Sequence, residues 1–229
     1  MTEPAAEAIS APVTVADEVW VAVAALDRVA PSGHRDDRLR AVALPEWRAA
    51  EFLAGRGLLR ELLAAVRPRL ADRDVVTDVR GKPRLRGRPG VGVSVSHSRG
   101  TVAVAVAVGR ELGVDVQQPR ETVSATLTRR LLGEHARDLT GLSAAGVARE
   151  AAWVWTAQEA CVKAGGEGLR GRPWSIDVPQ GARAGHWGDY RWVSLREHSA
   201  IPLSCAFGRR STARSAQHTF TTGKGDRQT

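Results

Sequence analysis

The chain has 229 residues, 43% of them hydrophobic and 25% charged, which is enough apolar material for a substantial core and excludes an intrinsically disordered protein. The formal net charge is +8, but the segment 209–229 alone holds five basic residues and one acid, so the excess charge is weak support for nucleic-acid binding. The chain starts without a basic and apolar leader, and its apolar run 101–108 is too short to cross a bilayer. Cys161 and Cys205 lie in apolar segments without metal-type spacing. We therefore expect reduced core cysteines in a cytoplasmic protein with no membrane contact.

The first half of the chain is predicted to hold one long helix among short strands. Residues 1–16 are expected to lack regular structure, and 31–40 read as a polar loop. The helix is predicted at 45–66, where apolar residues recur at helical spacing. Gly81, Lys82 and Pro83 predict a tight turn. Alternating or continuous apolar runs predict strands at 18–26, 75–79, 91–97, 101–108 and 112–117.

The second half repeats this order in outline. Helical patterns are predicted at 121–132, 134–139 and 144–166, and strands at 174–178, 190–195 and 201–207. The fold class is therefore α+β, with two similar α/β subdomains at 17–109 and 110–208 and a cleft between them. The segments 1–16 and 209–229 are expected to be disordered, the second because it is polar and basic.

The segment 144–166 places charged groups in an unusually apolar helix. Trp155, Glu159 and Lys163 share one helix face, because they follow one another at intervals of four residues. A helix that is apolar nearly all round is usually buried, and a buried carboxylate needs a cation or hydrogen bonds. The alternative is an ordinary solvated pair of Glu159 and Lys163 one turn apart, and the helix alone does not decide between the two.

A second lone carboxylate, Asp115, lies in the apolar strand 112–117. Two such groups are expected to be buried only if they converge on a cation, and hard oxygen ligands in small number suit Mg²⁺. Basic side chains elsewhere in the chain suit a polyphosphate ligand, although Arg48 and Arg56 can equally be solvated helix charges. These candidate phosphate ligands are Arg48, Arg56, Lys82, His97 and Lys163.

Three separated motifs resemble those of the Sfp-type 4'-phosphopantetheinyl transferases. They are Gly113-Val114-Asp115-Val116-Gln117, the helix segment Trp155-Thr156-Ala157-Gln158-Glu159-Ala160-Cys161-Val162-Lys163, and Ser94-Val95-Ser96-His97-Ser98. The segments 51–56 and 81–83 also resemble family signatures, and the likeness extends over roughly 47–207. Each motif is weak alone, but their shared order makes the resemblance specific.

The resemblance implies two halves related by a pseudo-twofold axis, with coenzyme A in the cleft and Mg²⁺ on its pyrophosphate. Asp115, Glu159 and Gln117 would be the metal ligands, and Lys163 would contact the phosphates near the bond that breaks. Ser96 and His97 would hold the nucleotide or its 3'-phosphate, with Lys82, Arg48 and Arg56 in the same basic clamp. Glu159, directly or through water, would take the proton from the attacking hydroxyl.

The implied reaction moves 4'-phosphopantetheine from coenzyme A onto a serine of an acyl or peptidyl carrier protein and releases adenosine 3',5'-bisphosphate. The enzyme is expected to be a monomer that binds no nucleic acid. Carrier proteins present acidic helices, so a basic and apolar surface is expected to receive them. The segment 120–139, with Arg129, Arg130, Leu131 and Leu132, is the candidate.

Two positions depart from the family pattern. Gln117 stands where many members have a second acid, and Gln158 stands where many have a lysine before the helix glutamate. These departures keep two alternatives open. One is a coenzyme A-binding regulator without catalysis, and the other is a basic nucleic-acid-binding protein, which would show a steep dependence of binding on salt.

Overall fold

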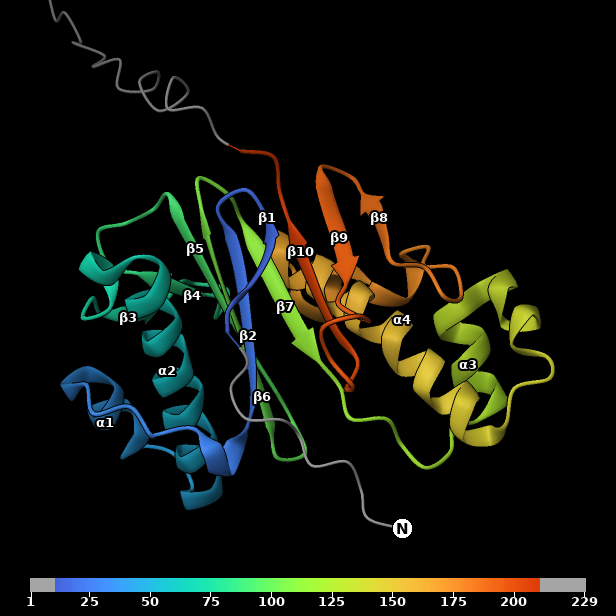
Figure 1. Ribbon diagram of the computed structural model, residues 1–229, viewed down its shortest axis with the longest axis horizontal. Coiled ribbons are helices and arrows are strands. Elements are labelled where there is room, and N and C mark those ends of the chain that lie inside the picture. Colours follow the sequence, from blue (N-terminus) through green and yellow to red (C-terminus); the bar gives the residue numbers. More distant parts are fainter. Residues whose placement is uncertain (1–10, 211–229) are drawn as a thin grey trace, which may run out of the picture.

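The computed structural model describes residues 11–210, which form four layers in the order helix, sheet, sheet, helix (Figure 1). Helix α2 (Glu46–Val66) covers the outer face of a six-stranded sheet, and α4 (Ala144–Gly165) covers the outer face of a four-stranded sheet. The inner faces of the two sheets pack on each other. The α+β class predicted from the sequence is confirmed.

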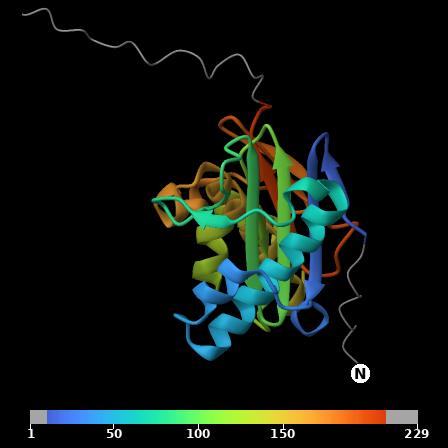
Figure 2. The same ribbon diagram turned by 90° about the vertical axis from the view of Figure 1, so that its left-hand side faces the viewer.

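The N-terminal sheet is antiparallel throughout, with strand order β1-β2-β6-β5-β4-β3. Figure 2 shows α1 (Arg35–Ala41) and α2 in front of it. Short 3₁₀ turns, Leu26–Arg28 and Pro68–Leu70, follow β2 and α2. The strands are β1 (Val13–Ala16), β2 (Val19–Ala25), β3 (Val75–Thr77), β4 (Pro83–Leu85), β5 (Val91–Ser98) and β6 (Thr101–Val108).

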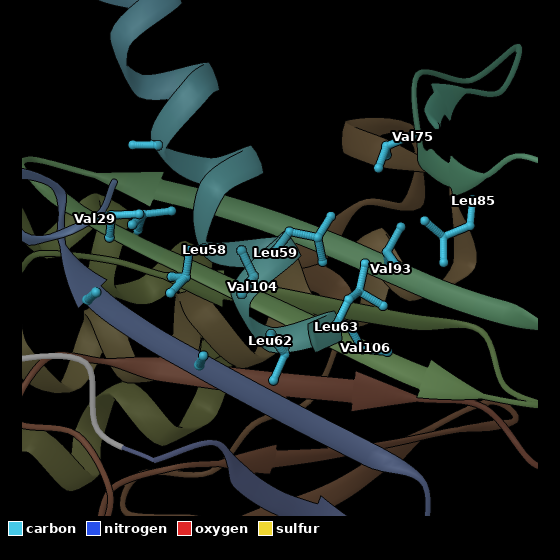
Figure 3. Packing of buried hydrophobic residues seen from close by; sticks show 14 of the residues in the cluster. Val29, Leu58, Leu59, Leu62, Leu63, Val75, Leu85, Val93, Val104 and Val106 are labelled. Atoms are coloured by element: carbon cyan, nitrogen blue, oxygen red, sulfur yellow. The ribbon is translucent and has the colours of Figure 1, made fainter. Parts of the chain in front are cut away.

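Strand β6 divides its side chains between two cores. Its valines at 102, 104 and 106 face α2 and pack with a row of helix leucines, several of which Figure 3 shows. Its alanines at 103, 105 and 107 face the second sheet. This follows from the strict alternation of the sequence in this strand, since successive strand residues point to opposite faces. Alanine on the inner face leaves little side-chain volume between the sheets, so they approach closely.

The C-terminal half has the strand order β7-β10-β9-β8. Helix α4 begins at the capping hydroxyl of Ser143 and ends at Gly166, whose φ is +71°. The last strand of the C-terminal half, β10, pairs with its first strand, β7, whereas the last strand of the N-terminal half, β6, pairs with its second strand, β2. The chain paths of the two halves are thus similar in part, and a twofold axis between them stays a prediction. The elements are β7 (Leu112–Val116), α3 (Ala125–Leu132), the 3₁₀ turns Gly133–Leu139, Gly168–Gly171 and Pro173–Ser175, and β8 (Ala184–Trp187), β9 (Tyr190–Ser194) and β10 (Leu203–Phe207).

Several predicted elements need correction. The segment 174–178 is no strand: it begins in a 3₁₀ turn, and the main-chain oxygen of Ile176 accepts a hydrogen bond from the Gln158 side chain of α4. Residues 13–16, expected to be irregular, pair with β2, and the tip of the predicted turn at Pro83 opens β4. Strand β8 was not predicted. The predicted tail 209–229 and the first ten residues lie outside the described part, apart from residues 209 and 210.

The predicted polar loop 31–40 contains helix α1, and a buried ion pair explains why. Asp37 is fully buried and accepts hydrogen bonds from Ser32 at 2.7 Å and from Arg60 at 2.8 Å. A buried carboxylate with these partners ties α1 to α2, which local sequence alone does not reveal. Among residues 11–210, no helix combines the length and the apolar character needed to span a membrane.

Gly113 sets how closely α4 approaches β7. A Cβ atom at this position would lie 2.2 Å from the main-chain oxygen of Ala160 and 2.6 Å from the nitrogen of Ala164, both in helix backbone. We expect Gly113→Ala to lower the free energy of unfolding by about 1–3 kcal/mol, because the helix must move away from the strand. Gly146→Ala on the same helix is the control, since its nearest contacts are at 3.4 Å. Equal midpoints for the two variants in urea unfolding would contradict this account.

Candidate active site

Strands β5 and β7 and helix α4 bring three of the predicted residues into contact. The ammonium of Lys163 donates to Asp115 Oδ1 at 2.6 Å, to Ser96 Oγ at 3.0 Å and to the main-chain oxygen of Val114 at 3.2 Å. Ser96 also donates to Asp115 Oδ1 at 2.7 Å. The Asp115 side chain is 8% exposed and that of Lys163 29%, so this ion pair is largely withdrawn from water.

Glu159 lies one turn before Lys163 and close to Asp115. Burial raises the pKa of Glu159, the charge of Asp115 raises it further, and Lys163 opposes both. The oxygens Asp115 Oδ2 and Glu159 Oε1 are buried without a hydrogen-bond partner. Two neighbouring carboxylates, each with a buried oxygen that lacks a partner, form an arrangement that a cation would stabilise. The structure therefore brings together the aspartate and the glutamate that the sequence singled out.

The donor set fits a hard divalent cation such as Mg²⁺. Between residues 11 and 210, no group of three or more His, Cys, Asp and Glu side chains could hold a metal. A metal here would thus have two protein carboxylates and would take its remaining ligands from water and substrate, as Mg²⁺ commonly does. Gln117 directly follows β7, and its side chain donates to the Gln118 main-chain oxygen at 3.1 Å. Its role as a third ligand stays a prediction.

His97 is on the opposite face of β5, as the alternation predicted, and points toward α2. A Cβ on Gly55 would lie 2.6 Å from His97 Nε2, so the helix glycine makes room for the ring. Burial lowers the pKa of His97 against the opposing influence of Glu51, which favours the neutral ring. Nε2 is buried without a partner.

The three other predicted phosphate ligands are each held by protein groups. Arg48 is half exposed and pairs with Glu51 at 3.0 Å. Arg56 is buried 3.7 Å from Asp37, and burial lowers its pKa to about 10 against the influence of that carboxylate. The ammonium of Lys82 donates to Glu111 and to the Ala164 main-chain oxygen, both at 2.6 Å. Binding of coenzyme A phosphates by these three residues stays a prediction.

Comparison with known families bears on the first half of the chain. Residues 36–107 match the sequence model of the 4'-phosphopantetheinyl transferase N-terminal domain. Over these residues the chain is similar to the 4'-phosphopantetheinyl transferase family. The resemblance predicted from the motifs is thereby confirmed, and phosphopantetheine transfer is supported as the general activity. No individual curated protein matches the chain. The matched residues include Ser96 and His97, whereas Asp115, Glu159 and Lys163 follow them and rest on the motifs and the geometry.

Gln158 has a structural role that its sequence position did not indicate. Its side chain is fully buried, and its amide nitrogen donates to the main-chain oxygens of Leu131 at 2.8 Å and Ile176 at 2.9 Å. The Gln158 side chain therefore points into the core, where its two hydrogen bonds connect α4 to α3 and to the end of the 3₁₀ turn at 173–175. A lysine at this position could also donate to the two carbonyl oxygens. Its positive charge would then be buried beside neutral acceptors, without a carboxylate to pair with.

Two apolar pockets adjoin helix α3. They lie in the C-terminal half of the protein, which also carries Asp115 and Glu159. The first has a volume of about 430 Å³ and is bordered by Gln117 and by Trp155, one turn before Glu159. The second, about 390 Å³, opens between α3 and the start of α4. Each has an arginine in its wall, Arg120 in the first and Arg129 in the second.

Proposed function

We propose that this protein transfers 4'-phosphopantetheine from coenzyme A to a serine of an acyl or peptidyl carrier protein, with Mg²⁺, and releases adenosine 3',5'-bisphosphate. The observation that carries the proposal is the pair of neighbouring carboxylates at Asp115 and Glu159. Each has one buried oxygen without a hydrogen-bond partner, and Lys163 pairs with the other oxygen of Asp115 at 2.6 Å. The family match of residues 36–107 supports the general activity.

The residues present divide the chemistry among them. Asp115 and Glu159 would hold Mg²⁺, which when bound offsets the negative charge of the pyrophosphate. Glu159, directly or through water, would take the proton from the carrier serine. Lys163 is held by Ser96 and Asp115 and would donate to the phosphate oxygen that leaves with the nucleotide. The nucleophile comes from the carrier, so the transferase itself needs none.

A single incubation separates the candidate functions. The protein is mixed with coenzyme A, Mg²⁺ and an apo carrier protein, and the carrier is weighed by intact-protein mass spectrometry. A gain equal to one phosphopantetheine group is the expected result. Binding of coenzyme A without this gain would favour the regulator, and salt-sensitive retention of nucleic acid without coenzyme A binding would favour the nucleic-acid-binding alternative.

Gln117→Glu is expected to tighten Mg²⁺ binding and to leave transfer intact, because a carboxylate is a better ligand for a hard cation than an amide. The measurement is the Mg²⁺ concentration that gives half-maximal transfer. Gln118→Glu adds the same charge at the neighbouring position, whose side chain bonds Thr101, and serves as the control. Weaker Mg²⁺ binding in Gln117→Glu would show that Gln117 is not beside the metal.

The segment 120–139 is proposed as the carrier-binding surface, with a correction to its predicted residues. Leu131 and Leu132 are buried in the core, and of the two only Leu131 lines a pocket. The exposed guanidiniums of Arg120 and Arg129 each border an apolar pocket. Such a surface suits a partner helix that carries apolar side chains among acids.

Reversing both charges, with Arg120→Glu and Arg129→Glu, is expected to raise the KM for the carrier and leave the KM for coenzyme A unchanged, since neither arginine is among the predicted ligands of coenzyme A or Mg²⁺. Initial rates at varied carrier and varied coenzyme A measure both constants. Arg28→Glu with Arg69→Glu makes the same charge change at exposed positions of the other half. An unchanged carrier KM in the first variant would remove this surface from the proposal.

A further inference from the structure

Strand β7 has one edge that is paired by main chain and one that is not. Its pairing with β10 covers all five of its residues, and beyond it the N–H of Gln117 donates to Pro202. Because N–H groups alternate sides along a strand, those of Val114 and Val116 face the other edge, which packs against β5. Val114 and Val116 are at most 1% exposed, so water cannot satisfy these donors.

Three serine hydroxyls of β5 satisfy this edge. The N–H groups of Val114, Val116 and Gln118 donate to the hydroxyl oxygens of Ser94, Ser96 and Ser98 at 3.1, 3.4 and 2.9 Å. Each serine meets the residue twenty positions later, so the two strands run in the same direction with a constant register. We call Ser94, Ser96 and Ser98 the serine ladder. It joins the two sheets through side chains where main-chain pairing is absent.

The middle residue of the serine ladder belongs to the candidate active site. Ser96 accepts from β7 and also donates to Asp115 Oδ1, which leaves Oδ2 free. Lys163 completes this edge by donating to the Val114 main-chain oxygen. Ser94, in contrast, accepts from the main chain of β7 at Val114, and Ser98 accepts from the main chain of Gln118, two residues after the strand. The serine ladder therefore fixes the place of Asp115 relative to β5, which carries Ser96 and His97.

We infer that Ser94 and Ser98 are positioning residues that hold β7 in register with β5 and so keep Asp115 Oδ2 turned toward the metal. The metal itself rests on the proposed function, whereas the hold on β7 does not. Removing both hydroxyls leaves the N–H groups of Val114, in β7, and of Gln118, two residues beyond it, without acceptors and lets the strand shift relative to β5. Loss of a residue that supports a metal ligand typically weakens metal binding by roughly 10- to 100-fold, and we expect a loss in this range.

The test compares four forms of the full chain: wild type, Ser94→Ala with Ser98→Ala, Ser98→Thr, and Ser194→Ala. Thr keeps the acceptor, and Ser194 supplies a buried hydroxyl of the second sheet away from β5. Amide hydrogen exchange followed by NMR reports on each β7 residue. Binding of Mn²⁺, a probe with ligand preferences like those of Mg²⁺, is measured from the electron paramagnetic resonance signal of the free ion.

In the double variant, exchange is expected to speed up at Val114 and Gln118 but not at Gly113 and Asp115, and Mn²⁺ affinity is expected to fall at least about 10-fold. Ser98→Thr and Ser194→Ala should behave like wild type in both measurements. If the double variant does not fold, Ser98→Ala alone, at the end of the serine ladder, provides the same comparison at Gln118.

Unchanged exchange in the double variant would overturn the inference, and so would faster exchange with unchanged Mn²⁺ affinity. An equal loss of affinity in Ser194→Ala would also overturn it, because the effect would then follow from any buried hydroxyl. A wild-type protein that binds no Mn²⁺ overturns it as well. A wild-type protein that binds Mn²⁺ in this way but transfers nothing refutes the proposed function and leaves the inference standing.

Discussion

Replacing Glu159 by glutamine is expected to abolish phosphopantetheine transfer, with a loss of roughly 100-fold or more, because the variant lacks both the base and one metal carboxylate. The fold should survive. Glutamine has nearly the same shape, and it removes a carboxylate that burial and Asp115 already make unfavourable in its charged form. Transfer is measured by the mass of the carrier, and stability by the thermal midpoint.

The pH dependence distinguishes this variant from a merely damaged one. The folded protein holds the Glu159 proton more tightly than the unfolded chain does, because the pKa lies above its ordinary value of 4.5. Glu159 therefore has no effect on stability below its unfolded pKa and destabilises the fold as pH rises through the folded value. Without divalent ions, Glu159→Gln should match wild type in acid and equal or exceed it at neutral pH. Glu134→Gln, at an exposed position, should change neither transfer nor stability. Near wild-type transfer by Glu159→Gln would refute its assignment.

Replacing Lys163 by methionine is expected to remove transfer and also to destabilise the fold. The side chain of Asp115 is 8% exposed, and without Lys163 its negative charge loses its cation. Removing one partner of a buried ion pair lowers the free energy of unfolding by about 3 kcal/mol or more. Because Lys163 is partly exposed, we expect a loss for this variant near the smallest value of that range. Urea unfolding and the carrier mass assay provide the two measurements.

A second substitution separates stability from chemistry at this pair. Adding Asp115→Asn to Lys163→Met removes the unpaired charge, so stability should recover while transfer stays absent. A double variant as unstable as the single one would show that Lys163 stabilises the fold through something other than its pairing with Asp115. Measurable transfer by either variant would show that the ammonium is not needed for catalysis.

The sequence was most informative where the period of apolar residues was clear. The alternation in β5 and β6 and the long apolar runs of α2 and α4 predicted these elements closely. The lone acids Asp115 and Glu159 stood out for a physical reason, because carboxylates in apolar segments need partners, and the structure brings them together with Lys163.

What the sequence could not provide were features that depend on distant partners. Helix α1 is held by Asp37, whose partners come from α2 and from the preceding loop. Gln158 stood out only as a departure from the family pattern, but it bonds main-chain oxygens from two other segments. The twenty-residue register between the serines of β5 and the amides of β7 is invisible until the two strands are placed together.

Because β6 contributes to two hydrophobic cores, the protein cannot be divided into fragments at this strand without exposing apolar surface. The segment matched by the family model ends at residue 107, inside this strand. A fragment released at that point would carry Ala103 and Ala105 on a bare, flat sheet face whose natural cover is β7 and β10. The two halves are therefore consecutive in the chain but share one hydrophobic core, so each half shields the inner sheet face of the other from water.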